Sequence, residues 1–221
     1  MSRRDRLRAE TTREITTIAF AQMAESGPGA ISLRGIAREM GMTARAIYSY
    51  FTTRDDLITA LVGGLATELA DALESAADAA TGPRERLLAW GRAFREWALA
   101  NREGFRLVYC DPVPGYQPPE NGPAEQASRR ICGGLNRLVA EVCAHADVLP
   151  ADGAGWPDFP DGYQQKVRSE VPDLDPAVAA LALRVWGRLH GLVSLEIYGH
   201  LRPVSSDPAA LYEAELRAVV S

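Results

Sequence analysis

The chain has 221 residues, 47% of them hydrophobic and 24% charged, a balance that suits a globular protein with a sizeable core. The chain has three cysteines, which is a small and odd number, so a framework of disulfides is not expected. This favours a protein of the reducing cytoplasm. No apolar run approaches the ~18 residues of a membrane span, and the charged N-terminus lacks the apolar core of a signal peptide. We therefore expect a cytoplasmic protein without a membrane partner.

Charge is unevenly distributed along the chain. The net charge is −5 at pH 7, but residues 1–54 hold nine arginines and five acidic residues, which gives +4 and leaves −9 for residues 55–221. A basic N-terminal part offers positive potential to phosphates. The acidic remainder would repel DNA and favour one orientation of approach.

The first residues are rich in arginine. Four arginines lie in residues 1–10: Arg3, Arg4, Arg6 and Arg8. We expect a mobile segment that either contacts phosphate or a minor groove, as basic arms do, or is a solvated, frayed terminus. Residues 11–26 then carry an apolar stripe at helical spacing, and Gly27-Pro28-Gly29 ends the predicted helix.

A helix-turn-helix pattern follows. Ser32 suits the N-cap of a helix over residues 33–40, whose apolar residues recur at i, i+3, i+4 and i+7. Thr43 can cap a second short helix that ends at Tyr50 or Phe51. In such a unit the second helix can lie in the DNA major groove, and the helix over 11–26 would brace both.

The outward side of this unit carries the candidate DNA contacts. Arginine can bind guanine through two hydrogen bonds, hydroxyl groups reach phosphates or base edges, and helix N-termini offer N–H groups to phosphates. The candidates are Ser32, Arg34, Thr43, Ala44, Arg45, Tyr48, Ser49, Tyr50 and Arg54. The alternative is a solvated helix face. Thr53 and Asp56 have the spacing of a capping box for a third helix.

The stretch AISLRGIAREMGMTARAIYSYFTTRDDLI resembles the DNA-binding signature of TetR-type transcriptional repressors. The residues at the spacings of that family are Ser32, Ile36, Ala37, Gly41, Ile47, Tyr48, Phe51 and Leu57. Tyr50 stands where the family often has His, and Arg54 where it often has Lys; both can still contact phosphate. The resemblance covers roughly the first quarter of the chain. It implies a dimeric, all-α repressor that a ligand releases from DNA.

Helical patterns alternate with breaks in the rest of the chain. Residues 55–80 carry a leucine at every fourth position from Leu57, which predicts a long helix leaving the three-helix headpiece of residues 1–54. Thr81-Gly82-Pro83 ends this helix, and Pro83 suits the first position of the next one. Residues 84–100 predict an amphipathic helix, and a shorter helix is expected over 103–109. The proline-rich residues 110–123 predict a surface loop.

A helix is expected over residues 123–145, followed by an irregular stretch over 146–162 that is either a lid or binding loop, or a mobile loop. Asp175-Pro176 starts a helix that runs to about Leu201 and is apolar on more than one face. Asp207-Pro208 starts a last helix. We expect these two C-terminal helices to pack with their two-fold mates in a homodimer.

Aromatic residues of the body are candidates for lining an effector cavity, since aromatic side chains with a few polar groups suit a small apolar ligand. The candidates are Trp90, Phe94, Trp97, Phe105, Tyr109, Trp156, Trp186 and His190. Ordinary core packing is the alternative for each. Trp186-Gly187-Arg188-Leu189-His190-Gly191 also resembles a C-terminal domain type of some TetR-like regulators, named for its Trp, His and Gly.

Catalytic and metal motifs are not found. Cys143, His145 and Asp147 match no strong metal spacing, and no nucleophile elbow, zinc-protease helix, phosphate loop or dinucleotide fingerprint occurs. His190 and Cys110 can be imagined as a base and a nucleophile, but no catalytic constellation surrounds them. We expect no cofactor.

The sequence thus predicts an all-α protein with a three-helix headpiece for DNA binding (residues 1–54) and a larger helical body for effector binding and dimerisation (residues 55–221). The predicted function is sequence-specific regulation of transcription, as a ligand-released repressor of neighbouring genes. Its partners would be double-stranded operator DNA and a small apolar or aromatic effector. Two alternatives remain: a constitutive DNA-binding regulator without an effector, and a small helical enzyme.

Overall fold

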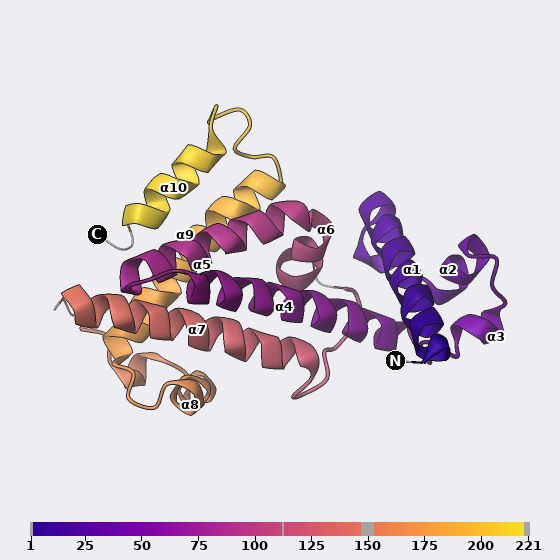
Figure 1. Cartoon of the computed structure of the whole chain (residues 1–221), viewed down its shortest axis with the longest axis horizontal. Coiled ribbons are helices and arrows are strands. Elements are labelled where there is room, and N and C mark those ends of the chain that lie inside the picture. The colour runs from indigo at the N-terminus through magenta and orange to yellow at the C-terminus, as the bar shows by residue number, and fades with distance from the viewer. Residues whose placement is uncertain (1, 112, 147–152, 219–221) are drawn as a thin grey trace. The chain divides into compact units, whose positions relative to one another are not determined.

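Regular secondary structure is entirely helical in the part of the chain that the structure describes, residues 2–111, 113–146 and 153–218, which confirms the predicted fold class (Figure 1). The structure is a computed structural model. Its backbone contacts divide the chain into two compact units. The first unit is Met1–Thr67 with Asn101–Glu125, and the second unit is Glu68–Ala100 with Gln126–Ser221.

The first unit begins with the predicted headpiece helices. They are α1 (Arg3–Ser26), the short 3-10 turn η1 (Pro28–Ala30), α2 (Leu33–Glu39), α3 (Ala44–Ile47) and the start of α4 (Arg54–Ala79). Two later elements, α6 (Arg102–Phe105) and the π-helical turn η2 (Arg106–Cys110), belong to the same unit, and α1 packs against α6. The headpiece core is apolar, and Ile15, Ile36 and Ile47 are 0% exposed.

Side-chain caps fix where the headpiece helices begin, as the sequence predicts. The hydroxyls of Ser32 and Thr43 each accept a hydrogen bond from the backbone N–H three residues later, at 3.3 and 3.2 Å. Thr53 and Asp56 form a reciprocal box: the Thr53 N–H donates to Asp56 at 2.9 Å, and the Asp56 N–H donates to Thr53 at 3.0 Å. These caps satisfy N–H groups that would otherwise have no partner at each helix start.

The start of α1 differs from the prediction. Residues 3–10 are helical, whereas the sequence predicted a helix only from residue 11. The reason is a second capping box, in which the Asp5 N–H donates to Ser2 Oγ at 3.1 Å and the Ser2 N–H donates to Asp5 at 2.9 Å. The same interaction lowers the pKa of the Asp5 carboxyl.

The end of α3 also differs. The helix ends at Ile47, about one turn before the predicted end at Tyr50 or Phe51. Beyond it, the Ser49 N–H donates to the carbonyl of Ala46 and the Tyr50 N–H to that of Ile47, each three residues back. The chain therefore tightens into a turn there, as helix ends often do.

The second unit contains the C-terminal helices and parts of two long ones. Beside the end of α4 it holds α5 (Pro83–Ala100), most of α7 (Pro123–Ala146), the short turn η3 (Trp156–Asp158), α8 (Asp161–Glu170), α9 (Pro176–Ile197) and α10 (Pro208–Ala218). Within this unit α10 packs against both α5 and α9 (Figure 1). The predicted apolar face of α5 is buried from Leu87 to Ala98.

Ion pairs join α4, α5 and α7 inside the second unit. Arg130 of α7 binds Glu74 of α4 at 2.9 Å through Nε and Asp71 at 2.6 Å through Nη2. Arg86 of α5 donates to the carbonyl of Ala77, close to the end of α4, and also pairs with Glu141 of α7. Both arginines stabilise the packing between helices, and Arg86 also satisfies a carbonyl near the end of α4.

The sequence did not predict α8. Only Val167 is buried along it, so it shows no apolar periodicity from which a helix could be inferred. Its Gln164 side chain donates to the carbonyls of Trp156 and Phe159 at 2.9 and 2.8 Å, which fastens part of the predicted irregular stretch to the helix. Residues 147–152 of that stretch lie outside the described residues.

Helix α4 runs through the boundary between the two units, which lies at Thr67 and Glu68. Gly63 and Gly64 precede that boundary. A Cβ on Gly63 would come 2.8 Å from Pro123 at the start of α7, so this glycine permits a close approach within the first unit. Thr67 donates its hydroxyl to the carbonyl of Gly63 at 2.8 Å.

One helix in the described part of the chain, Pro176–Ile197, is long and apolar enough to cross a membrane by length and composition, with a mean hydropathy of 1.2. The signal is weak, because the core helices of globular domains meet the same criterion. Val185, Leu189 and Val193 of this helix are no more than 1% exposed, so one of its faces is already packed inside the protein.

Candidate functional site

The nine residues predicted to contact DNA lie around α2, α3 and the start of α4, all in the first unit. Seven of them are exposed: Ser32, Arg34, Thr43, Ala44, Arg45, Tyr48 and Ser49. Tyr50 and Arg54 are half-buried. The structure thus gathers the predicted set on one small helical unit, and its exposed members are accessible to a large partner.

Helix α3 is anchored on one side and open on the other. Ile47 is 0% exposed and Phe51 is 9% exposed, and both belong to the headpiece core. Tyr48 is 41% exposed, and Arg45 is exposed on the same short helix. A small helix held by two apolar anchors can present a guanidinium and a phenol to a groove without losing its own packing.

Arg8 of α1 contacts two of the residues predicted to bind DNA, Ser49 and Tyr50. Arg8 donates through Nη2 to the carbonyl of Ser49 at 3.1 Å, and its guanidinium carbon lies 4.8 Å from the centre of the Tyr50 ring. The Ser49 hydroxyl donates to the carbonyl of Ala46 at 2.7 Å, so its oxygen remains able to accept. The sequence did not predict the interaction with Arg8, because it joins residues 41 positions apart.

Arg54 has a structural role in the headpiece. Its Nε donates to the carbonyl of Ile31 at 2.9 Å, and its Nη2 lies 3.3 Å from the carbonyls of Pro28 and Gly29. These bonds tie the start of α4 to the segment between α1 and α2. A phosphate contact by Arg54 stays a prediction, since some of its five N–H donors are already used here.

The eight predicted effector residues are divided between the two units. Phe105 and Tyr109 belong to the first unit, where their rings lie 5.3 Å apart. In the second unit, Trp156 stacks under Arg168 at 4.6 Å. Trp97 is 6% exposed and donates its indole N–H to Glu68 at 3.0 Å.

The remaining four effector candidates form an aromatic cluster between α5 and α9 within the second unit. Trp186 lies 6.3 Å from Trp90, 5.0 Å from Phe94 and 5.2 Å from His190, measured between ring centres. Burial lowers the pKa of His190, and its Nδ1 lies 3.4 Å from the Ser194 hydroxyl. His190 is therefore a neutral imidazole at neutral pH, which can donate one hydrogen bond and accept another.

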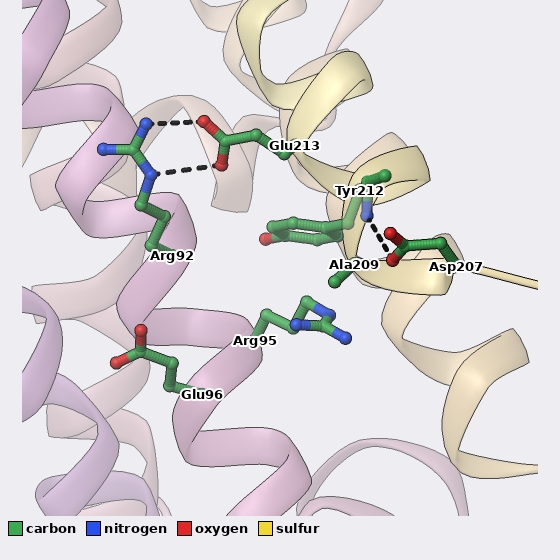
Figure 2. A pocket seen from close by; sticks show the side chains of 8 residues that line it. Arg92, Arg95, Glu96, Asp207, Ala209, Tyr212 and Glu213 are labelled. Atoms are coloured by element: carbon green, nitrogen blue, oxygen red, sulfur yellow. Dashed lines mark hydrogen bonds and ion pairs between the residues drawn. The ribbon is translucent and has the colours of Figure 1, made fainter.

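A hollow of about 380 Å³ lies elsewhere in the second unit, between α5 and α10 (Figure 2). Five of its eight lining residues are charged, and the full lining is Arg92, Arg95, Glu96, Asp207, Ala209, Ala210, Tyr212 and Glu213. Two of these charges satisfy each other, and Arg95 pairs with Glu196, which does not line the hollow. Figure 2 shows Arg92 bound to Glu213 through two hydrogen bonds, and Asp207 caps α10 by accepting from a backbone N–H at 2.9 Å. The sequence did not single out this site, because its members come from helices distant in the chain.

Metal-binding clusters are absent among the described residues, where no group of three His, Cys, Asp or Glu side chains is placed to hold an ion. Asp147, one of the residues considered for a metal site, lies outside the described residues. Cys143, by contrast, is described, and burial raises the pKa of its thiol.

Two family models match the chain. Residues 15–61 match the model described as bacterial regulatory proteins, tetR family, and residues 87–219 match the tetracyclin repressor-like C-terminal domain. The first match contains α2 and α3 together with their caps. The second spans the aromatic cluster and both C-terminal helices.

Relatives and solved structures agree with these matches. The HTH-type transcriptional regulators Rv1816 of Mycobacterium tuberculosis and Mb1846 of Mycobacterium bovis are each 31% identical over 99% of this chain and 94% of their own. The crystal structure of regulatory protein SCO4313 has a TM-score of 0.79 at 32% identity and covers 99% of this chain and 98% of that one. A tetR-family protein from Rhodococcus RHA1 shares the fold, with a TM-score of 0.69 at 18% identity over 95% of this chain and 94% of its own.

Proposed function

The chain belongs to the TetR family of bacterial transcriptional regulators, and from this premise we propose that it is a homodimeric repressor that binds operator DNA and is released by a small apolar or aromatic effector. We assign DNA binding to residues 1–54 and effector binding and dimerisation to residues 55–221, and we expect the protein in the cytoplasm. The one observation that carries the proposal is α3, whose apolar residues are anchored while Arg45 and Tyr48 are exposed.

Each half of the dimer would insert α3 into a major groove, with the two half-sites about one helical turn, ~34–36 Å, or somewhat more apart. Arg45 would bind a base edge or phosphate, and the hydroxyls of Tyr48 and Ser49 would reach the backbone. Ser32 and Thr43 cap helix starts whose N–H groups favour phosphate, and Arg34 lies exposed in the first turn of α2. Ala44 is the first residue of α3 and would lie against the groove wall.

Dimerisation through α9 and α10 is supported by their apolar surfaces. Leu183, Leu195 and Tyr198 of the α9 segment are 44, 42 and 41% exposed, and Leu211 of α10 is 41% exposed. The positions of Gly187 and Gly191 have open space around them, which would allow a partner helix to approach closely. Burial of such a surface against a second copy would remove apolar side chains from water.

The effector would bind at the aromatic cluster of Trp90, Phe94, Trp186 and His190, with neutral His190 as the hydrogen-bonding group. We also propose that the segment from Trp186 to Gly191 belongs to the C-terminal domain type named for its Trp, His and Gly. The effector would release DNA only to the extent that it prefers a conformation with a different headpiece separation. Helix α4 would transmit that change.

A second candidate is a DNA-binding regulator without an effector. It is favoured by the packing of the cluster itself, since Trp90 is 2% and Phe94 0% exposed, as in an ordinary core. A thermal-shift screen with apolar and aromatic compounds distinguishes the two, because only a sensor gains stability from a ligand. A stabilising compound should also weaken binding to the operator.

The DNA-binding assignment is tested with Arg45→Ala and Tyr48→Ala on a duplex from the region upstream of the protein's own gene. We expect each variant to lose about 1–3 kcal/mol of operator affinity, which is five- to more than a hundred-fold. Arg13→Ala is a matched control, because Arg13 is exposed on α1 and outside the proposed contact set. Wild-type affinity in both α3 variants would refute the assignment of the recognition helix.

A further inference from the structure

A basic hollow of about 540 Å³ lies in the first unit, next to the proposed DNA-contacting residues. It is lined by Arg3, Arg4, Leu7 and Arg8 from one face of α1 and by Ser49 and Tyr50 from the turn after α3. No carboxylate lines it. Among the described residues, none of its three arginines takes part in an ion pair. Three guanidinium groups around one hollow without a counter-ion create a strong positive potential, which favours a bound anion.

The hollow is held in place by two independent sets of interactions. The capping box of Ser2 and Asp5 keeps the first turn of α1 helical, which directs Arg3 and Arg4 to the same side as Arg8. Arg8 joins the two walls, because its guanidinium donates to Ser49 and stacks on Tyr50. Ordering of Arg8 and of the helix that carries Arg3 and Arg4 lowers the entropy that binding would otherwise cost.

We propose that this hollow binds the phosphate backbone of DNA beside the groove entered by α3, as a binding surface outside the part of the chain that matches the family's DNA-binding model. That match begins at residue 15, whereas α1 begins at Arg3. The proposal rests on the proposed function, because Ser49 and Tyr50 belong both to the hollow and to the predicted DNA contacts. Arg3 and Arg4 line the same hollow as Ser49 and Tyr50, so a DNA backbone that contacts those two residues would also meet the two arginines.

The roles within the hollow differ. Arg3 and Arg4 bind phosphate oxygens, for which the planar guanidinium is well suited. Arg8 is a positioning residue that fixes the Tyr50 ring, so that the Tyr50 hydroxyl faces the same backbone. Phosphate contacts carry no sequence information, so the hollow adds affinity and salt dependence equally on every duplex.

The experiment compares the double variant Arg3→Ala/Arg4→Ala with Arg6→Ala in the full-length protein. Arg6 is exposed on α1 but does not line the hollow, so its replacement removes charge from the same helix without touching the site. Affinity is measured against salt concentration on the duplex from the upstream region and on an unrelated duplex of equal length. Circular dichroism and thermal melting establish that each variant is folded.

Log affinity falls linearly with log salt concentration, and we expect the slope of this line to be less negative in the double variant on both duplexes. The slope should change by about 0.9 for each phosphate that is no longer bound. Arg6→Ala should leave the slope unchanged. Ethylation of phosphates flanking the operator should interfere with binding of the wild type and no longer with binding of the double variant. Arg8→Ala should weaken binding, and Tyr50→Phe, which keeps the ring under Arg8, should remove only what the hydroxyl contributes.

Equal slopes for the double variant, Arg6→Ala and the wild type would overturn the inference while leaving the proposed function intact, provided that Arg45→Ala still weakens operator binding. Failure of the wild type to bind any duplex at low salt would overturn both. Inorganic phosphate is added at matched ionic strength to identify the other source of the same anion. Phosphate could weaken DNA binding more than chloride does in the wild type but not in the double variant. If the salt slopes of the two proteins are also equal, the hollow is a site for free phosphate.

Discussion

Arg92 on α5 and Glu213 on α10 form a two-pronged ion pair, with Nε 3.1 Å from Oε2 and Nη2 2.6 Å from Oε1. A parallel pair joins Arg95 of α5 to Glu196 of α9 at 2.9 and 2.7 Å. Helix α5 thus holds both C-terminal helices through the same chemistry, and the Tyr212 hydroxyl adds a hydrogen bond to the carbonyl of Gly91 at 2.7 Å. Such fork-shaped pairs fix geometry as well as contributing energy.

Glu213→Gln should lower stability at neutral pH by up to about 1 kcal/mol, a modest value because the Arg92 side chain is 40% exposed and screened by solvent. Hydrogen bonding to Arg92 lowers the pKa of Glu213 from its ordinary 4.5. Its contribution is therefore complete above pH 4.5 and is lost as the pH falls through the lower folded-state pKa. Chemical denaturation at several pH values measures this. The difference between wild type and variant should vanish in acid, whereas Glu120→Gln, in an exposed loop, should show no such difference at any pH.

Gly91→Ala should destabilise the protein by about 1–3 kcal/mol through overpacking. An added Cβ would come 2.5 Å from Leu216 Cδ1 on α10, and Leu216 is 0% exposed. Gly134→Ala in α7 is the matched control, since nothing lies within 4 Å of the place that its added methyl group would take, and alanine favours a helix by roughly 1 kcal/mol. Thermal melting of both variants should give opposite signs. Equal behaviour would mean that α10 does not pack against Gly91 in solution.

Arg54→Ala should destabilise the headpiece by about 1–3 kcal/mol, because three backbone carbonyls lose a charged donor. Arg54→Lys should restore little of this loss, since one ammonium group cannot span the same acceptors. Hydrogen exchange of residues 28–33 and denaturation of the whole protein measure the effect. Unchanged stability together with weaker operator binding would instead favour the phosphate contact that the sequence predicts for Arg54.

His190→Phe should make stability less dependent on pH. Burial lowers the pKa of His190 below its ordinary 6.5, so the folded state binds a proton less readily than the unfolded chain. The contribution of His190 to stability therefore falls as the pH drops below 6.5, and the phenylalanine variant should lack that component. Melting temperatures measured on either side of pH 6.5 provide the readout. A wild type and a variant with parallel pH profiles would contradict a half-buried imidazole that stays neutral.

The sequence predicted the elements whose signals are local. Ser32 and Thr43 cap the helices as expected, because a cap depends only on residues a few positions away. Pro83 and Pro176 open α5 and α9 for the same reason. The start of α1 was missed although Ser2 and Asp5 have the same capping spacing, because the run of arginines outweighed that signal.

What the sequence could not supply was the pairing of distant segments. The bond from Arg8 to Ser49, the ion pair of Arg92 with Glu213 and the close approach of Gly91 to Leu216 each join positions far apart in the chain. Helix α8 was missed for another reason, since a helix with Val167 as its buried residue has no apolar stripe to recognise. Periodicity predicts which face of a helix is buried, but not which partner covers it.

The two adjacent glycines of α4 have a mechanical consequence. Each glycine is less favourable in a helix than alanine by roughly 1 kcal/mol, and neither has a side chain that could restrict bending of the helix. They stand just before Thr67, where the first compact unit gives way to the second. These two positions have the lowest helix propensity in α4, so a bend or a twist of this helix would concentrate beside the boundary between the two units.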